Sequence, residues 1–240
     1  MTNTPIINKM SERLLAVASL VTPGSRTADI GTDHGYVPVY LVENGIVPSA
    51  VAMDVRKGPL ARAKETVAGA GLSDRIGLRL SDGLEKLQPG EADTAVIAGM
   101  GGMLICRILT SHPETTESLK ELVLEPQSET DKVRRLLPEI GFAITDERMI
   151  FEDGKYYPVI KAEKQAASPA ALSEMEVHFG PVLLQRRDPI LRKYLAWQIQ
   201  VSEQIAGRLA AAGSENSMQR LQEVKEELRL LLAAYSRYEM

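Results

Sequence analysis

The chain has 240 residues, of which 44% are hydrophobic and 25% charged, and its formal net charge is −4. This composition is ordinary for a soluble globular protein of one large or two modest domains, and neither a secretory signal nor an apolar run of the ~18 residues that a membrane span needs is evident. Because there is a single cysteine, Cys106, and the three histidines are scattered, we expect a cytoplasmic protein without a disulfide, a metal or a membrane contact.

Between about residues 6 and 164, short β-rich runs alternate with helical patterns, which is typical of a parallel sheet with crossover helices. An amphipathic helix is expected first, at residues 7–21, ended by the sequence TPG. Strands are then expected at 27–30, 49–53, 75–80, 93–98 and 121–125, with helices at 37–43, 58–70 and 102–109.

The end of this region adds a helix and a hairpin. Ser128 followed by Asp131 is a capping-box pattern that predicts a helix at 129–140, and Gly141 suits its C-terminal end. Two further strands, 142–151 and 156–162, flank EDGK, a hairpin-type turn. Five alternating strands and a hairpin predict a doubly wound α/β sheet with an antiparallel strand at its end.

After residue 164 the pattern becomes helical. Ser168 before Pro169 predicts a helix start, and HFGP predicts its stop. From Pro189 onward two apolar stripes at helical spacing are separated by GSENS, which predicts an antiparallel, coiled-coil-like helical hairpin. We therefore divide the chain into an α/β domain, 1–165, and a helical module, 166–240.

The stretch TADIGTDHGYVP indicates a ligand site at the end of the first strand. Gly31 and Gly35 allow backbone to approach a ligand. Asp29 and Asp33 would repel a pyrophosphate but suit a cationic ligand. S-adenosylmethionine (SAM), which carries a sulfonium and an ammonium group, is thus favoured over NAD, for which the third glycine of G-x-G-x-x-G is also missing.

Later strand ends carry groups that suit a nucleoside. Asp54 ends the second strand and can accept both ribose hydroxyls. Asp82, before Gly83, can accept the adenine amino group, and the glycines of IAGMGG leave room beside the sulfonium for a flat substrate. Each feature alone also fits a plain turn, a solvated strand end or a helix cap, but their order at successive strand ends favours a nucleoside-cofactor site.

Together, GTDHGYVP, AMDV, SDGL and IAGMGG resemble the bacterial tRNA (adenine-22-N1)-methyltransferase family over nearly the whole chain. The resemblance implies a Rossmann-like seven-stranded sheet, SAM as cofactor, and N1-methylation of an adenine in the tRNA D-loop. Glu125 stands where we would expect an amide, so it receives no role. The resemblance implies cofactor contacts at Asp29, Ile30, Gly31, Thr32, Asp33, His34, Gly35, Asp54, Asp82, Gly83, Ala98, Gly99 and Met100.

The reaction itself needs no base, because adenine N1 carries a lone pair and no proton. The main task is alignment with the sulfonium–methyl bond, and we expect Asp33, His34 and Gly101 at the rim of the target-base pocket. Local basic clusters are expected to contact tRNA despite the net charge. These RNA contacts are Arg56, Lys57, Arg186, Arg187, Arg192 and Lys193, with Lys132, Arg134 and Arg135 as a further basic group.

Three alternatives remain open at this point. The same cofactor site could serve a small-molecule or protein methyltransferase, whose C-terminal hairpin would act as a dimer contact or lid. A non-enzymatic RNA-binding scaffold and an NAD enzyme are the other two. The sequence leaves the oligomeric state open and favours a monomer.

Overall fold

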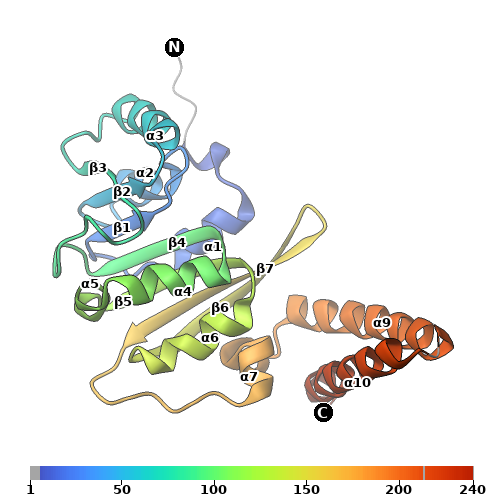
Figure 1. Ribbon diagram of the computed structural model, residues 1–240. Coiled ribbons are helices and arrows are strands. Elements are labelled where there is room, and N and C mark those ends of the chain that lie inside the picture. The colour runs from blue at the N-terminus through green and yellow to red at the C-terminus, as the bar shows by residue number, and fades with distance from the viewer. Residues whose placement is uncertain (1–5, 213, 240) are drawn as a thin grey trace. The chain divides into compact units, whose positions relative to one another are not determined.

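The computed structural model describes residues 6–212 and 214–239. The chain forms two compact units, the first ending at Ala171 and the second beginning at Leu172 (Figure 1). Within the described residues, no helix is both long enough and apolar enough to cross a membrane. The same residues contain no cluster of three or more His, Cys, Asp or Glu side chains that could hold a metal ion.

The first unit contains a single seven-stranded sheet in the order β3-β2-β1-β4-β5-β7-β6. Neighbouring strands from β3 to β5 are parallel, and β7 runs antiparallel to both β5 and β6. The strands are β1 (Thr27–Ile30), β2 (Ala50–Asp54), β3 (Ile76–Leu80), β4 (Thr94–Gly101), β5 (Glu121–Ser128), β6 (Phe142–Glu152) and β7 (Lys155–Lys164). The predicted α/β sheet is confirmed.

The terminal hairpin corrects one detail of the prediction. Asp153 (φ 49°) and Gly154 (φ 75°) form its turn, with the positive φ values that a tight hairpin favours. Because the second strand of the hairpin pairs with β5, the antiparallel strand lies between β5 and β6 and not at the edge of the sheet.

Helices cover both faces of the sheet and bury a hydrophobic core on each. Val96 and Val123 face one core with residues of α1, α2 and α3, while Ile97 and Leu124 face the other with residues of α4 and α6. This alternation follows the two-residue period of a strand. The helices are α1 (Glu12–Leu20), α2 (Tyr36–Glu43), α3 (Lys57–Gly69), α4 (Gly102–Ser111), α5 (Pro113–Ser118) and α6 (Thr130–Glu139).

Two predicted helix starts in this unit were wrong. The helix expected at 7–21 is divided into a 3-10 helix, η1 (Ile6–Lys9), and α1, because the Ser11 hydroxyl accepts the Leu14 amide and caps a new start. The capping box at Ser128 does not form, because Ser128 is still part of β5 and Glu129 (φ 50°) becomes the cap residue without a side-chain bond. The end of α6 before Gly141 (φ 83°) is as predicted.

The second unit is entirely helical in its described part. The helix start predicted at Ser168 was wrong. α7 (Glu174–Phe179) begins after a capping box in which Ser173 and Glu176 bond each other's backbone amides. The predicted stop is confirmed, since Gly180 (φ 89°) ends α7. α8 (Pro181–Gln185), α9 (Pro189–Ala212), α10 (Glu215–Tyr235) and the 3-10 helix η2 (Ser236–Tyr238) complete the unit.

α9 and α10 pack against each other as the predicted helical hairpin (Figure 1). Their buried residues include Leu191, Leu195, Leu221, Val224 and Leu231. Of the predicted GSENS turn, residue 213 lies outside the described residues, and the segment from 215 onward already belongs to α10. Coiled-coil packing in the strict sense stays a prediction.

Candidate cofactor and substrate site

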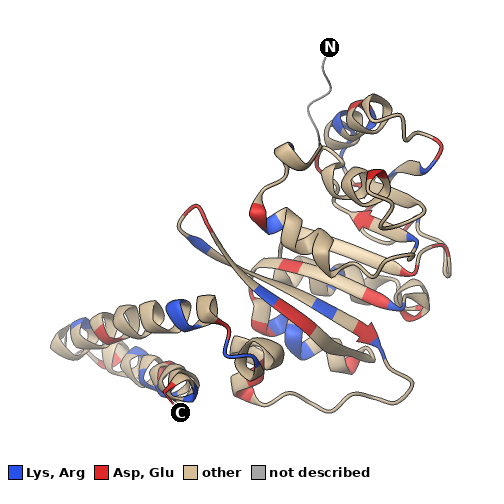
Figure 2. Ribbon diagram, turned by 180° about the vertical axis from the view of Figure 1, so that it is seen from behind, with Lys and Arg blue, Asp and Glu red and all other residues tan. Residues whose placement is uncertain are grey.

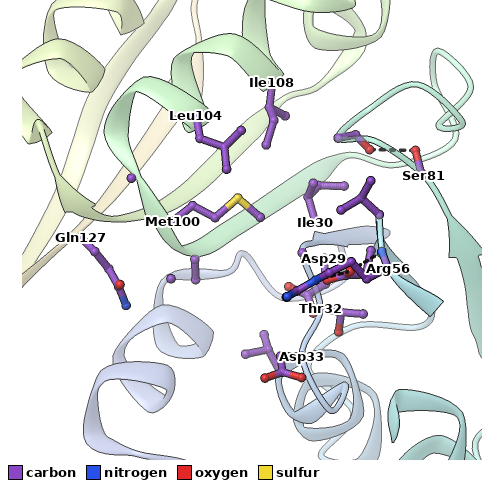
Figure 3. Close-up of a pocket in the computed structure, with 18 of the residues that line it drawn as sticks. Asp29, Ile30, Thr32, Asp33, Arg56, Ser81, Met100, Leu104, Ile108 and Gln127 are labelled. Carbon is purple, nitrogen blue, oxygen red and sulfur yellow. Dashed lines mark hydrogen bonds and ion pairs between the residues drawn. The ribbon is translucent and has the colours of Figure 1, made fainter. Parts of the chain in front are cut away.

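A pocket of about 690 Å³ lies at the carboxyl ends of the parallel strands, where open α/β sheets bind ligands (Figure 3). The turns after β1, β2 and β3, the end of β4 and the start of α4 supply most of its wall. Arg13 and Leu14 of α1 and Gln127 of β5 complete it. The pocket therefore draws on segments that are far apart in the sequence.

The glycine turn after β1 brings backbone to the pocket. The amides of Gly31 and Thr32 both donate to the Met53 carbonyl, at 2.7 and 2.8 Å, which ties this turn to β2. Gly31 has φ +79°, and a Cβ there would lie 1.9 Å from Cε of Met100. The positive φ strains any other residue here, and a Cβ would also require the end of the Met100 side chain to move, so the turn favours glycine at position 31.

Two buried carboxylates, at the ends of β1 and β2, form the floor of the pocket. Asp29 is 7% exposed and Asp54 is 5% exposed, and both line the pocket. Burial raises the pKa of the Asp29 carboxyl to about 6; the nearby Thr32 hydroxyl opposes this effect and the Asp54 charge reinforces it. A bound cation would relieve this cost, so the floor can accommodate a positively charged group.

Asp54 keeps one oxygen available to a ligand. Its Oδ1 accepts the Arg56 amide at 2.7 Å, and the Arg56 Nε lies 3.8 Å from the same oxygen. Within the described part of the chain, Oδ2 makes no hydrogen bond. The carboxylate is thus oriented by backbone and still able to accept hydroxyl donors.

The two exposed acids of the pocket are each held by an arginine. Asp33 Oδ1 accepts from Arg62 at 2.6 Å, and Asp82 Oδ1 accepts from Arg107 at 3.1 Å. The hydrogen bond from Arg62 holds the pKa of the Asp33 carboxyl below its usual range. Asp33 is therefore anionic at neutral pH. The His34 ring stacks on that of Tyr36 beside it, with centroids 5.2 Å apart.

The end of β4 forms the opposite wall. Gly99 (φ +76°) donates its amide to Glu125 Oε2 at 2.7 Å, and Arg13 Nη1 binds the same oxygen at 2.8 Å. Glu125 is fully buried, and its hydrogen bond to the Gly99 amide holds the end of β4 in place. Gly102 packs tightest in this segment, since a Cβ there would lie 2.5 Å from the carbonyl oxygens of residues 128 and 129.

The structure brings nearly all sequence-predicted site residues together. Each of the predicted cofactor residues except Gly35 lines the pocket, as do the predicted rim residues Asp33, His34 and Gly101. Gly35 (φ +67°) instead caps the start of α2, where a Cβ would meet Ala63 at 3.2 Å. The sequence reasoning missed these lining residues: Arg13, Leu14, Tyr36, Val37, Val55, Ser81, Leu104, Arg107, Ile108 and Gln127.

The predicted RNA contacts fall on both units. Arg56 lines the pocket mouth, and Lys57 is exposed at the start of α3. Arg134 is not accessible, because it is 1% exposed and bonds Glu147 at 2.9 Å. In the second unit, Arg192 lies over the Tyr235 ring at 5.7 Å. Arg186, Arg187, Arg192 and Lys193 are all exposed.

Two other cations of the hairpin are paired with acids. Arg220 and Arg229 pair with Glu223 and Glu226, both at 2.6 Å, and basic and acidic segments alternate along the two helices (Figure 2). Among the described residues, Arg187 and Lys193 have no ion pair. The cluster at 186–193 therefore presents exposed cations, as do Arg208 and Lys225, which also make no ion pair within the described part of the hairpin.

The fold and the pocket define a Rossmann-like protein with a site for a cationic nucleoside cofactor. Residues 27–233 match the family model described as TrmK, tRNA (adenine(22)-N(1))-methyltransferase. The tRNA (adenine(22)-N(1))-methyltransferase of Bacillus subtilis strain 168 is 35% identical over 227 residues, which are 93% of this chain and 95% of that protein.

Solved structures agree with this match. Streptococcus pneumoniae Sp1610, in complex with S-adenosyl-L-methionine, is 32% identical with a TM-score of 0.80 and covers 94% of this chain and 99% of its own. TrmK of M. capricolum, in complex with S-adenosyl-homocysteine (SAH), is 27% identical with a TM-score of 0.82, covering 95% and 98%. The chain belongs to the tRNA (adenine(22)-N(1))-methyltransferase family. It is a SAM-dependent enzyme that methylates N1 of adenine in tRNA.

Proposed function

We propose that the pocket binds SAM with its ribose hydroxyls on Asp54, its adenine amino group on Asp82 and its ammonium group toward Asp29. The observation that carries this assignment is the convergence of these acids, from three successive strand ends, on one pocket. The target adenine, at position 22 of the D-loop as in the named relatives, would lie against the wall formed by 99–101.

The residues present fit this cofactor. The buried acids of the floor favour a positive charge, and a pyrophosphate would be repelled by them. The Thr32 hydroxyl is buried beside the Asp29 carboxyl and lines the pocket, where it can also contact a polar ligand atom. Met100, Gly31 and Gly99 all line the pocket, and Figure 3 shows the Met100 side chain between Gln127 and Ile30.

Bound SAM supplies a methyl group on a positively charged sulfur. The chain has to hold the adenine so that the N1 lone pair points along the sulfur–methyl bond, since N1 carries no proton that a base would need to remove. The product adenine is a cation. The Asp33 carboxylate at the pocket mouth stays anionic at neutral pH and would favour the developing charge. No residue is therefore assigned as a general base.

The second unit would hold the body of the tRNA. Its exposed cluster at 186–193 presents cations that can meet phosphates. An adenine in a folded tRNA must also leave its stack before it can enter the pocket, at a cost of a few kcal/mol, and additional grip on the tRNA offsets that cost. We propose the division of labour as a SAM-binding domain, 1–165, and a tRNA-binding module, 166–240, in a monomeric cytoplasmic enzyme.

The test is nucleoside analysis of an unmodified tRNA transcript after incubation with enzyme and methyl-labelled SAM. We expect one N1-methyladenosine per tRNA, and none when the target adenine is replaced by guanine. The matched control is Asp54→Ala, which should lower product formation at limiting SAM. Methylation of a metabolite extract or of protein, without product in tRNA, would support the small-molecule or protein methyltransferase alternative.

A further inference from the structure

Gln127 lies at an irregular point of the sheet that faces the proposed target-base wall. Along the β4–β5 ladder, Ala98 pairs with Glu125, Met100 with Pro126 and Gly101 with Ser128. The register therefore skips Gly99 on one strand and Gln127 on the other. Bulges of this kind re-aim side chains and are common beside active sites.

The displaced residues meet each other at the pocket. Nε2 of Gln127 lies 3.9 Å from the position that a Cβ on Gly99 would take, and Nη1 of Arg13 lies 4.0 Å from it. In Figure 3, Gln127 lies on the other side of Met100 from Asp29 and Ser81. Gln127 is thus separated from the proposed cofactor acids and close to the wall proposed for the substrate.

Of these two polar groups, only the amide is unoccupied. Arg13 binds Glu125 at 2.8 Å, approaches Glu152 at 3.8 Å and stacks over the Tyr157 ring at 5.2 Å. Gln127 is exposed, and its side chain makes no hydrogen bond within the described residues. A planar amide with a free donor and a free acceptor, placed at the pocket wall, is suited to read a base edge.

The chemistry limits which edge of the adenine it can read. N1 has to remain free for the methyl group, so recognition cannot use it. The other polar edge offers the N6 amino donor and the N7 acceptor, and a glutamine or asparagine amide matches this pair with two hydrogen bonds. Guanine presents two acceptors there, O6 and N7, which one amide cannot satisfy in the same way.

We propose that Gln127 is a specificity-determining residue that binds the N6 and N7 atoms of the target adenine and so turns its N1 toward the methyl group. This assignment rests on the proposed function, because it takes the wall at 99–101 as the substrate side of the pocket. The sequence analysis expected an amide at position 125, where the chain has Glu125. Gln127 provides that amide two residues later.

The experiment combines a protein change with a base change. Wild type and Gln127→Ala are assayed on two tRNA transcripts, one with adenine and one with 7-deazaadenine at the target position, which lacks only the N7 acceptor. We expect Gln127→Ala to lower kcat/KM on adenine by about 10–100-fold. We expect 7-deazaadenine to lower kcat/KM for wild type. For Gln127→Ala, kcat/KM should be nearly the same on 7-deazaadenine as on adenine. Any change in the intrinsic reactivity of N1 affects both proteins equally and cancels in this comparison.

The controls separate the possible failures. Gln127→Glu keeps the shape and the N6 acceptor but places a carboxylate against N7, so it should be at least as impaired as the alanine variant. Gln88→Ala, an exposed amide outside the pocket, should match wild type. SAM affinity should be unchanged in every variant, which also reports an intact fold.

Equal losses on 7-deazaadenine for wild type and Gln127→Ala would overturn the proposal, as would full activity of Gln127→Ala or Gln127→Glu. Absence of product from wild type on adenine would instead defeat the proposed function, and this proposal with it. A Gln127 variant that loses SAM binding would place the residue on the cofactor side, which also contradicts the proposal.

Discussion

The raised pKa of Asp29 makes cofactor affinity dependent on pH in a way that the structure specifies. Burial raises this pKa to about 6, and the proposed ammonium contact requires the ionised carboxylate. The α-amino group of the ligand, with a pKa near ~8, stays charged below that value. Binding therefore has to remove a proton from Asp29 when the pH is below about 6, and affinity falls as the pH falls.

The size of the effect follows from that pKa. Below about pH 6, affinity should drop up to tenfold per pH unit, so it should be about tenfold weaker at pH 5 than at pH 7. Calorimetric titration with SAM and with SAH, at constant ionic strength from pH 5 to 8, measures this. Both ligands should give the same midpoint, because both carry the ammonium group and only SAM carries the sulfonium.

Two variants identify the titrating group. Asp29→Asn should bind weakly at every pH and lose the slope. His34 also lines the pocket, so its replacement serves as the control. His34→Asn, chosen because asparagine tolerates the positive φ of 64°, should therefore keep the slope. A slope that persists in Asp29→Asn and vanishes in His34→Asn would refute the reasoning.

The same carboxylate should cost stability at neutral pH. Its folded pKa, about 6, lies above its unfolded value near ~3.9, so the folded state binds the proton more tightly. The stabilisation from the neutral form is complete below about pH 4 and is lost as the pH rises through about 6. Asp29→Asn should thus raise the free energy of unfolding at pH 8 by up to about 3 kcal/mol while weakening SAM binding. Equal stability of both proteins at pH 4 and at pH 8 would contradict this.

Three further predictions concern the other parts of the site. Asp54→Ala should weaken SAM binding by about 1–3 kcal/mol, and Asp54→Asn by less because it keeps the acceptor for the Arg56 amide; calorimetry with unchanged affinity in a folded Asp54→Ala protein would exclude the ribose contact. Gly31→Val should abolish SAM binding through strain and contact with Met100, while Gly101→Val, at an ordinary φ of −64°, should bind SAM and lose methyl transfer; wild-type turnover of either variant would place the site elsewhere. The last variant neutralises the exposed cluster, which is Arg186, Arg187, Arg192 and Lys193. It should weaken tRNA binding and lower the slope of log affinity against log salt concentration by roughly 0.7–0.9 per lost phosphate contact, without changing SAM affinity. Equal slopes for the variant and wild type would show that the cluster is only a solvated face.

The cofactor side of the pocket could be predicted because its residues mark strand ends. A hydrophobic run that stops at Asp54, or at Ser81 before Asp82, is visible locally, and parallel strands bring their carboxyl ends to one edge. All seven strands could be predicted because each is a local β-rich run in the sequence. What local sequence could not show is whether a glycine with positive φ serves a ligand or a neighbouring helix: Gly31 serves the pocket, and Gly35 allows close packing on Ala63.

Beyond Asp33, His34 and the glycines at 99–101, the substrate side could not be predicted, because it depends on long-range contacts and on register. Arg13 and Glu125 are 112 positions apart and meet only once α1 has packed on the sheet. Gln127 reaches the pocket through a bulge that no periodic pattern records. The capping box at Ser128 failed near the same feature, since Ser128 still pairs with Gly101 as part of β5 and the cap position of α6 falls one residue later, on Glu129.

The enzyme binds SAM, a cation, and methylates tRNA, a polyanion. It therefore needs negative charge inside the pocket and no strong negative charge at the pocket mouth, and the structure shows how the two can occur together. The acids at the strand ends point inward. Each exposed acid is held by an arginine from a helix: Arg62 of α3 binds Asp33, and Arg107 of α4 binds Asp82. The arginine side chains are about half exposed, so their remaining donors face solvent at the mouth. Each of these ion pairs is close to neutral, so the exposed acids add little negative charge at the pocket mouth, and an approaching phosphate meets such local pairs and not the net charge of −4.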